Sequence, residues 1–256
     1  MKKALVIFSG GQDSTTCLYW AKQHFDEVNA LTFDYGQRHR RELDAAHLIG
    51  KMCGVASHEL VTLGRDVLKG TSPLVSGEKL EQYEDHHSLP GGIEKTFVPM
   101  RNQLFLTIAA NRAVCLGAEV MVTGVCEEDF GGYPDCRQVF INAVELATNR
   151  SNEGAAPVME IATPLMRLTK AKTVKLALEL PGCYRALAYS HTAYDGQYPP
   201  VGHDHATLLR AKGFEEACVP DPLILRAVSE GLMEMPGTEN YGDDILELYQ
   251  GILENK

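Results

Sequence analysis

The chain has 256 residues, 45% of them hydrophobic, so it can bury a full core without a disulfide or a structural metal. Its formal net charge of −10 excludes a general attraction to nucleic-acid phosphates, so we expect a small-molecule substrate and no nucleic-acid partner. The apolar run before Ser9 is too short for a signal peptide, and no run reaches the roughly 18 residues of a membrane span, which predicts a cytoplasmic protein with no membrane partner.

The first predicted unit is a strand followed by a helix. Residues 4–8 form a continuous apolar run with β-branched and aromatic side chains, which is typical of a strand buried on both faces. Ser9, Gly10 and Gly11 end this run. Capping side chains and then apolar residues at helical spacing follow, which predicts a helix directly after the glycines.

Strands and helices continue to alternate along the chain. Expected strands cover residues 28–33, 59–63 and 119–125; expected helices cover residues 41–53, 101–116, 139–148, 206–212, 223–232 and 244–253, and one more begins near residue 168. Residues 69–94 are polar and aperiodic, so we expect a long surface loop or lid there. This alternation predicts an α/β fold with a doubly wound parallel sheet. We expect a nucleotide-binding domain over residues 1–187 and a smaller C-terminal loop and helical part over residues 188–256.

The glycine-rich loop between the first strand and helix carries the main chemical signal. It consists of Ser9, Gly10, Gly11, Gln12, Asp13, Ser14 and Thr15. Backbone N–H groups and the helix dipole at such a junction attract an anion, and glycines let a pyrophosphate approach closely. The hydroxyls of Ser9, Ser14 and Thr15 are further donors, and Asp13 offers an oxygen ligand for Mg²⁺. An ordinary tight turn with a helix cap is the alternative.

The loop fits neither the GxxxxGK[ST] nor the GxGxxG pattern. It resembles the pyrophosphate loop of the N-type ATP pyrophosphatases, whose fold is of the adenine nucleotide alpha hydrolase type. Four further segments resemble one family of this superfamily, the 7-cyano-7-deazaguanine synthases; they are residues 33–39, 97–102, 131–137 and 163–165, with Lys170 following. Together with the loop, these segments extend the resemblance over nearly the whole chain.

The resemblance implies an ATP-dependent ligase that acts in queuosine or other deazapurine biosynthesis. The carboxylate of 7-carboxy-7-deazaguanine would be adenylated, ammonia would give the amide, and a second activation would give the nitrile. ATP and Mg²⁺ are the implied cofactors, and a homodimer is the implied assembly. A divergent relative that stops at the amide or adenylates another substrate, another ligase of the superfamily, and a nonenzymatic ATP sensor remain alternatives.

The matched segments also supply candidate site residues. Arg101 is expected to clamp a carboxylate or phosphate, and Lys170 to neutralise charge on the adenylate phosphate, with Asp13 as the third catalytic candidate. The expected substrate-binding residues are Tyr35, Gln37, His39, Arg101, Asn102, Tyr133, Asp135 and Arg137. Asp135 is the candidate acceptor for a guanine-type edge. Exposed helix residues, turns and caps are the alternative interpretation at each position.

The chain departs from the family at the four cysteines that usually bind a structural zinc. The corresponding positions are Ala193, Val201, Asp204 and Thr207, none of which supplies a thiolate, so zinc is not expected. Nearby nitrogen and oxygen ligands remain as an alternative metal set: His191, His203, Asp204 and His205. The seven cysteines are odd in number and nowhere spaced as Cys-x-x-Cys, which predicts free thiols in a reducing compartment.

Overall fold

The computed structural model describes residues 1–242, except for 38–39, 65, 71, 77–79, 86–87, 89–91, 128–131 and 195. Its centre is a five-stranded sheet in the order β3-β2-β1-β4-β5, and every neighbouring pair is parallel. The strands are β1 (Lys3–Ile7), β2 (Glu27–Asp34), β3 (Ser57–Thr62), β4 (Val120–Val122) and β5 (Glu160–Ala162). The predicted α/β fold with a parallel sheet is therefore confirmed.

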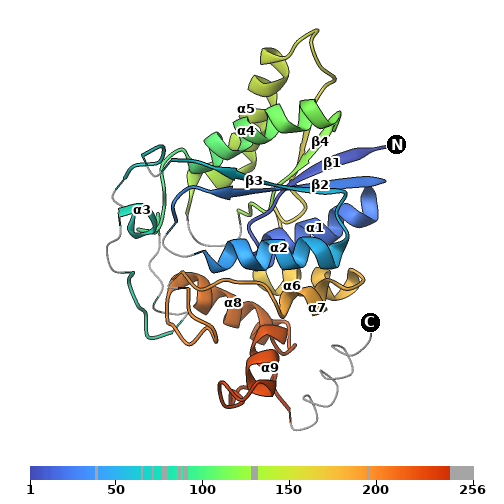
Figure 1. Ribbon diagram of the computed structural model, residues 1–256. Coiled ribbons are helices and arrows are strands. Elements are labelled where there is room, and N and C mark those ends of the chain that lie inside the picture. Colours follow the sequence, from blue (N-terminus) through green and yellow to red (C-terminus); the bar gives the residue numbers. More distant parts are fainter. Residues whose placement is uncertain are drawn as a thin grey trace.

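Helices cover both faces of this sheet (Figure 1). Helices α1 (Gln12–His24), α2 (Arg41–Cys53) and α6 (Lys170–Glu179) pack on one face, and α4 (Arg101–Leu116) and α5 (Gln138–Ser151) pack on the other. The alternation of side chains in the central strand β1 explains the two cores. Ala4 and Val6 belong to the core under α1, whereas Leu5 belongs to the core under α4. This two-sided burial accounts for the continuous apolar run in the sequence.

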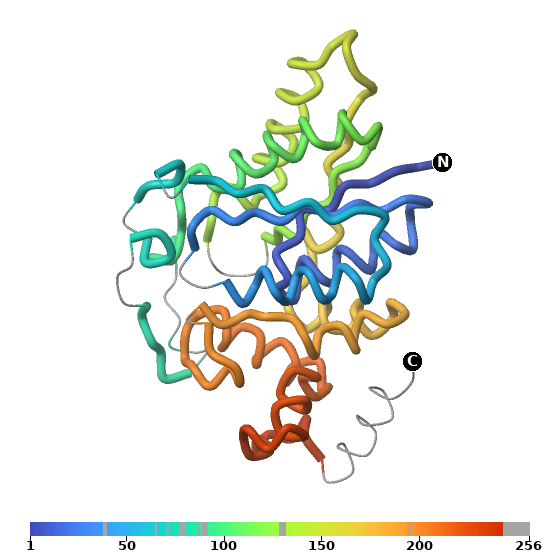
Figure 2. Tube along the Cα trace, viewed as in Figure 1, coloured from blue at the N-terminus to red at the C-terminus, as the bar shows by residue number. Residues whose placement is uncertain are grey.

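Three C-terminal helices follow α6: α7 (Cys183–Leu187), α8 (His205–Glu216) and α9 (Pro222–Ser229). Helix α7 lies beside α6 and packs against α1, whereas α8 packs against α6 and α9 against α7, below the first helical layer (Figure 2). Phe214 of α8 is buried in the same core cluster as α1. Gly213 lies so close to α6 that a Cβ there would come within 2.8 Å of the Lys170 Cβ. A division at residue 187 stays a prediction.

The structure differs from the expected elements in several places. The polar stretch 69–94 contains one helical turn, α3 (Pro73–Ser76), where the Ser72 hydroxyl accepts a hydrogen bond from the Leu74 N–H at 3.3 Å. A single turn is too short to show a helical period. Helix α7 is likewise a short helix that the sequence analysis did not predict. The helix expected at 244–253 lies outside the described residues. Within the part of the chain that is described, no helix is long and apolar enough to cross a membrane.

Candidate active site

A cavity of about 380 Å³ lies at the carboxyl ends of β1, β2 and β4. The chain leaves β1 toward β2 on one side and returns later to β4 on the other, so this edge is the topological switch point of the sheet, where open α/β sheets bind ligands. The wall combines the glycine-rich loop, the first turns of α2, α4 and α6, and the C-terminal segment. Eleven of the predicted nucleotide-binding, catalytic and substrate-binding residues line it: Ser9, Gly11, Gln12, Asp13, Ser14, Tyr35, Gln37, Arg101, Asn102, Tyr133 and Lys170.

The glycine-rich loop owes its shape to Gly10. This residue has a φ of +85°, and a Cβ there would lie 2.6 Å from the Glu42 carbonyl oxygen and 2.7 Å from the Ala46 nitrogen. Gly11 is different, because it has an ordinary φ of −80° as the N-cap of α1 and a Cβ would lie 3.4 Å from Ser9 Oγ. Only Gly10 therefore requires glycine on steric grounds, and it does so because α2 packs directly on the loop.

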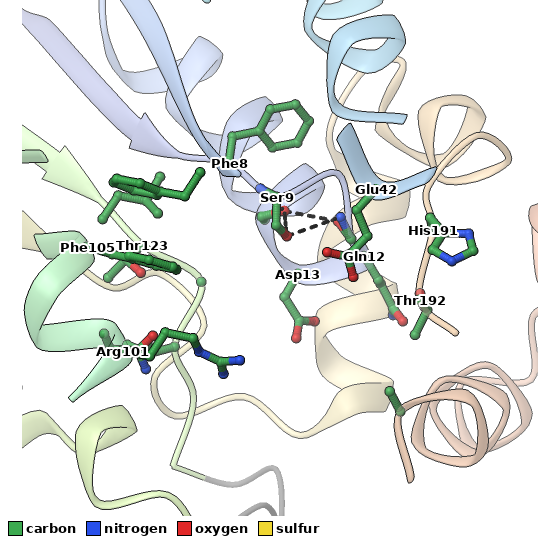
Figure 3. Close-up of a pocket in the computed structure, with 18 of the residues that line it drawn as sticks. Phe8, Ser9, Gln12, Asp13, Glu42, Arg101, Phe105, Thr123, His191 and Thr192 are labelled. Atoms are coloured by element: carbon green, nitrogen blue, oxygen red, sulfur yellow. Dashed lines mark hydrogen bonds between the residues drawn. The ribbon is translucent and has the colours of Figure 1, made fainter. Parts of the chain in front are cut away.

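The hydroxyls of Ser9 and Ser14 bond within the loop, whereas the hydroxyl of Thr15 is buried with no partner among the described residues. The Ser9 N–H donates to Ser14 Oγ at 3.2 Å, the two hydroxyls lie 3.0 Å apart, and Ser14 Oγ donates to the Gly11 carbonyl at 3.2 Å (Figure 3). Thr15 is fully buried, and its N–H donates to the Gly11 carbonyl at 3.0 Å. The loop is thus held rigid before any ligand binds, which suits a preorganised anion site.

Lys170 and Asp13 meet across the cavity floor. Lys170 Nζ lies 2.6 Å from Asp13 Oδ2, and the two side chains are 13% and 31% exposed. Thr169 caps α6 by accepting from the Lys172 N–H, which sets Lys170 as the first residue of the helix. Asp13 Oδ1 is buried with no hydrogen-bonding partner among the described residues. One carboxylate oxygen of Asp13 therefore holds Lys170, and the other is left for a ligand.

Arg101 begins α4 and extends its guanidinium toward the interior of the cavity, facing the side of Asp13 (Figure 3). Tyr35, Tyr133 and Tyr194 lie near it and line the same cavity. Burial raises the pKa of Tyr35 and Tyr133, so both hydroxyls stay protonated at neutral pH. Arg101 is thus a permanent cation among neutral hydroxyl groups, an arrangement suited to a carboxylate or a phosphate.

Two of the predicted substrate residues, Asn102 and Asp135, are hydrogen-bonded to each other. The Asp135 carboxylate accepts from the Asn102 N–H at 3.3 Å, and the Asn102 amide donates to the Asp135 carbonyl at 3.2 Å. These two bonds brace the start of α4 against the short 3₁₀ turn η2 (Pro134–Cys136). Arg137 is exposed and precedes α5. Asn102 lines the cavity, whereas Asp135 and Arg137 are not among its described lining residues.

The segment after β2 contributes two of its three predicted residues. Gln37 Oε1 accepts from the Tyr35 N–H at 2.9 Å, and Gln37 Nε2 donates to the Phe33 carbonyl at 3.3 Å. Both Tyr35 and Gln37 line the cavity. His39 lies outside the described residues. The side chain of Gln37 therefore shapes this turn, as the capping alternative expects, and also faces the cavity.

Sequence reasoning missed Glu42, which lies in the first turn of α2 and lines the cavity. Burial raises the pKa of its carboxyl from 4.5 to about 7, and the nearby charge of Arg101 opposes this shift. It also missed Phe105, which stacks on Phe33 with ring centroids 4.2 Å apart and faces the cavity. The sequence did carry one indication that Glu42 lies at the site, because this residue lies at the start of a helix that follows a parallel strand.

The positions of the family's zinc cysteines are occupied by residues that pack and cap. Asp204 caps α8 by accepting from the N–H groups of Ala206 and Thr207 at 3.0 and 3.1 Å. Ala193 is fully buried, and Val201 is 56% exposed. In the described part of the chain, no three His, Cys, Asp or Glu side chains are grouped to hold a metal. The residues present do not fit a tetrahedral zinc.

A buried ion pair lies in this C-terminal region instead. Arg210 donates to both carboxylate oxygens of Asp221 at 2.6 and 2.8 Å, and the side chains are 3% and 4% exposed. The same guanidinium also donates to Ser190 Oγ at 2.7 Å and Thr192 Oγ1 at 2.8 Å. Arg210 therefore ties α8 to the segment that forms one wall of the cavity, and to the start of α9.

Comparison with known proteins assigns the chain to a family. The family model described as "Queuosine biosynthesis protein QueC" matches residues 3–218. A 7-cyano-7-deazaguanine synthase of Gloeobacter violaceus is 56% identical over 87% of this chain and 96% of its own length, and one of Chromobacterium violaceum is 48% identical over 90% and 96%. A solved structure of a predicted tRNA methyltransferase subunit from Methanocaldococcus jannaschii is similar over 70% of this chain and 75% of that one, with 20% identity and a TM-score of 0.46. On the match to residues 3–218, the chain belongs to the QueC family of queuosine biosynthesis proteins.

Proposed function

We propose that this protein converts 7-carboxy-7-deazaguanine and ammonia to 7-cyano-7-deazaguanine with ATP, through an adenylated acid and an amide. The observation that carries the proposal is the 56% identity to a 7-cyano-7-deazaguanine synthase over 87% of the chain. The cavity supports it, because an anion-binding loop, Arg101 and Lys170 line one space at the switch point of the sheet. The enzyme would be a ligase that forms a carbon–nitrogen bond.

The loop residues and Lys170 are proposed to act on the nucleotide. Backbone N–H groups of the loop would hold the phosphates, and Lys170 would neutralise the charge on the phosphate of the departing AMP. Mg²⁺ fits Asp13, whose Oδ1 is buried with no partner among the described residues and is a hard oxygen ligand. Bound there, Mg²⁺ would neutralise phosphate charge. Asp13 also holds Lys170 in position through its other oxygen.

The opposite wall is proposed to bind the deazapurine acid. Arg101 would hold the substrate carboxylate, and Tyr35, Gln37 and Tyr133 would contact the ring. The aromatic face of Phe105 is suited to stacking against a planar base. The proposed substrate-binding residues also include Asn102, Asp135 and Arg137, which lie where the start of α4 is braced. His39 stays a candidate as well. Zinc has no part in this proposal, because the residues at the family's cysteine positions do not fit it.

A homodimer in the cytoplasm is the proposed state of the enzyme. Val139 and Leu146 on α5 are 72% and 61% exposed, and apolar side chains on an outer helix suit an interface between two copies. All seven cysteines are free thiols, which fits a reducing compartment. Light scattering on the purified protein tests the dimer. A monomer at micromolar concentration would refute it.

The reaction itself is tested by incubating the purified protein with 7-carboxy-7-deazaguanine, ATP, Mg²⁺ and ammonium. Mass spectrometry follows the deazapurine, and chromatography follows ATP, AMP and pyrophosphate. The expected result is the nitrile with AMP. Accumulation of the amide as the final product would restrict the activity to the first half of the reaction, and unchanged acid with intact ATP would refute the substrate.

A further inference from the structure

The side chain of Gln12 is buried in the cavity wall without a partner. It is 4% exposed, and neither Nε2 nor Oε1 makes a hydrogen bond within the described part of the chain. Leaving a buried polar group unpaired costs about 1–3 kcal/mol, and such groups are rare in native proteins. Because Gln12 lines the cavity, its amide is placed to meet a ligand that enters there. Binding of phosphate by loop N–H groups does not require this amide.

Glu42 lies beside Gln12 on the cavity wall (Figure 3). Its carbonyl packs on Gly10 of the loop, and the charge of Arg101 reaches its carboxyl from across the cavity. Figure 3 shows Gln12 and Glu42 on the same wall, with Arg101 and Phe105 on the opposite wall. Glu42 therefore lies beside the loop that would hold ATP and across the cavity from the residue that would hold the acid.

The chemistry of these two side chains selects the ligand. A carboxylate next to a phosphate-binding loop repels another phosphate and attracts a cation. The amide oxygen of Gln12 and the carboxylate oxygens of Glu42 accept hydrogen bonds, which ammonium donates. The acid carbon that ammonia attacks must lie between the loop and Arg101. Gln12 and Glu42 line the same cavity, so a nitrogen nucleophile held by their side chains would lie in the space that this carbon occupies.

We propose that Gln12 and Glu42 form the binding site for ammonium and that Glu42 is the general base that converts it to ammonia; this inference rests on the proposed function. An N–H bond of ammonium breaks, its electron pair stays on nitrogen, and the proton moves to a Glu42 carboxylate oxygen. Ammonia then bonds to the activated carbon. The carbon–oxygen bond to the adenylate breaks, AMP leaves with that electron pair, and a second proton passes from nitrogen to water.

The electrostatic surroundings of Glu42 agree with this role. Burial raises the pKa of its carboxyl to about 7, which is near the optimum for a base that works at neutral pH. The titratable groups that face it are Arg101 of α4, Tyr35 after β2 and Tyr194 of the C-terminal segment. Burial raises the pKa of both tyrosines, so Glu42 is the member of this group that titrates near neutrality.

The test separates adenylation from capture of the nucleophile. Acid-dependent exchange of pyrophosphate into ATP, without any nitrogen nucleophile, measures adenylation. Amide formation is then measured with ammonium and, separately, with hydroxylamine, which is already neutral at pH 7.5 and needs no base. Glu42→Gln is compared with Asp44→Asn, an exposed residue on the same helix whose change removes the same charge.

With Glu42→Gln, the rate with subsaturating ammonium should fall about 100-fold, the usual contribution of a general base. The rates of pyrophosphate exchange and of the reaction with hydroxylamine should stay within about threefold of the wild-type rates, since neither reaction requires the base. Gln12→Met, which keeps the length of the side chain, should raise the KM for ammonium about tenfold through one lost hydrogen bond. Asp44→Asn should match the wild type.

Equal losses with ammonium and hydroxylamine in Glu42→Gln would overturn the proposal, as would a loss of exchange or unchanged kinetics with ammonium. Thermal unfolding of each variant shows whether it is folded, and Gln12→Met tests the site independently of Glu42. Failure of the wild type to catalyse acid-dependent exchange is a different result. It would refute the proposed function, and the inference with it.

Discussion

Lys170 Nζ and Asp13 Oδ2 form an ion pair of 2.6 Å although 157 residues separate them in the chain. The pair joins the first turn of α1 to the first turn of α6, two of the helices that begin at the cavity. Asp13 keeps Lys170 pointed at the place where the loop would bind phosphate. The lysine is thus a fixed charge before the nucleotide arrives, which favours electrostatic stabilisation of a leaving phosphate.

Replacing Lys170 by Met should lower the kcat for AMP formation about 10²–10³-fold, because a preorganised positive charge is lost. Lys172→Met, on the exposed side of the same helix, is the matched control and should keep wild-type kcat. Steady-state AMP release at saturating substrates measures both. A Lys170 variant that raises only the KM for ATP would show that the residue binds nucleotide without acting on the reaction.

Gly10→Ala should lower the free energy of unfolding by about 2 kcal/mol or more, because it combines a left-handed backbone with a contact to the α2 backbone at 2.6 Å. Gly54→Ala is the control for the backbone conformation alone. Its φ is +64° and no atom lies within 4 Å of a Cβ there, so about 1 kcal/mol is expected. Urea unfolding compares the two variants. Equal losses would show that the contact with α2 relaxes freely.

Arg210→Met should lower the free energy of unfolding by about 3–5 kcal/mol, since it leaves Asp221 as a buried charge without its partner. The double variant Arg210→Met with Asp221→Leu removes both charges and should recover part of that loss. Thermal and denaturant unfolding of the single and double variants form the measurement. If the double variant is no more stable than the single one, the remaining contacts of Arg210 dominate over the ion pair.

Glu42 should make the stability of the protein depend on pH between about 4.5 and 7. Its folded pKa is raised from 4.5 to about 7, so its stabilising contribution is fully present below pH 4.5 and is lost as the pH rises through 7. Glu42→Gln removes this dependence, because an amide does not titrate. The variant should therefore be more stable than the wild type at pH 8 by about 1–3 kcal/mol.

The same variant should differ little from the wild type near pH 4.5, where both side chains are neutral. Denaturant unfolding at pH 4.5 and pH 8 measures the difference, with Asp44→Asn as the control for removal of one exposed charge. A variant that is less stable than the wild type at pH 8 would mean that the Glu42 carboxylate is stabilised by its surroundings, contrary to the pKa shift.

The elements that the sequence predicted well depend on local patterns. The apolar run of β1, the glycines after it and the capping residues that follow all act within one turn of each other, so the loop and its place at the sheet edge could be predicted. Lys170 follows Thr169, whose capping of α6 is likewise local. Placement of Arg101 and Lys170 in one cavity then follows from parallel strands that end at one edge.

The contact of Asp135 with Asn102 shows what could not be predicted from the sequence. The position of Asp135 on a loop beyond a strand suggested a contact with the base, which stays a prediction, and in the structure its carboxylate accepts from the Asn102 N–H. That N–H is one of the unpaired donors at the start of α4, and no local pattern tells which distant side chain will satisfy it. The zinc positions are similar: the sequence showed the missing thiolates, whereas the cap of Asp204 and the Arg210–Asp221 pair are visible only in the folded chain.

The sequence by itself therefore determined the parallel α/β fold, the glycine-rich loop at the sheet edge and the loss of the zinc thiolates, because each depends on residue type and spacing along a short stretch. Only the tertiary structure decided that Glu42 and Gln12 line one cavity, that Asp13 holds Lys170, and that Asp135 accepts from the Asn102 N–H. Those outcomes depend on contacts between residues distant in the chain, and burial of a side chain, with the pKa that follows from it, is a property of the packed molecule.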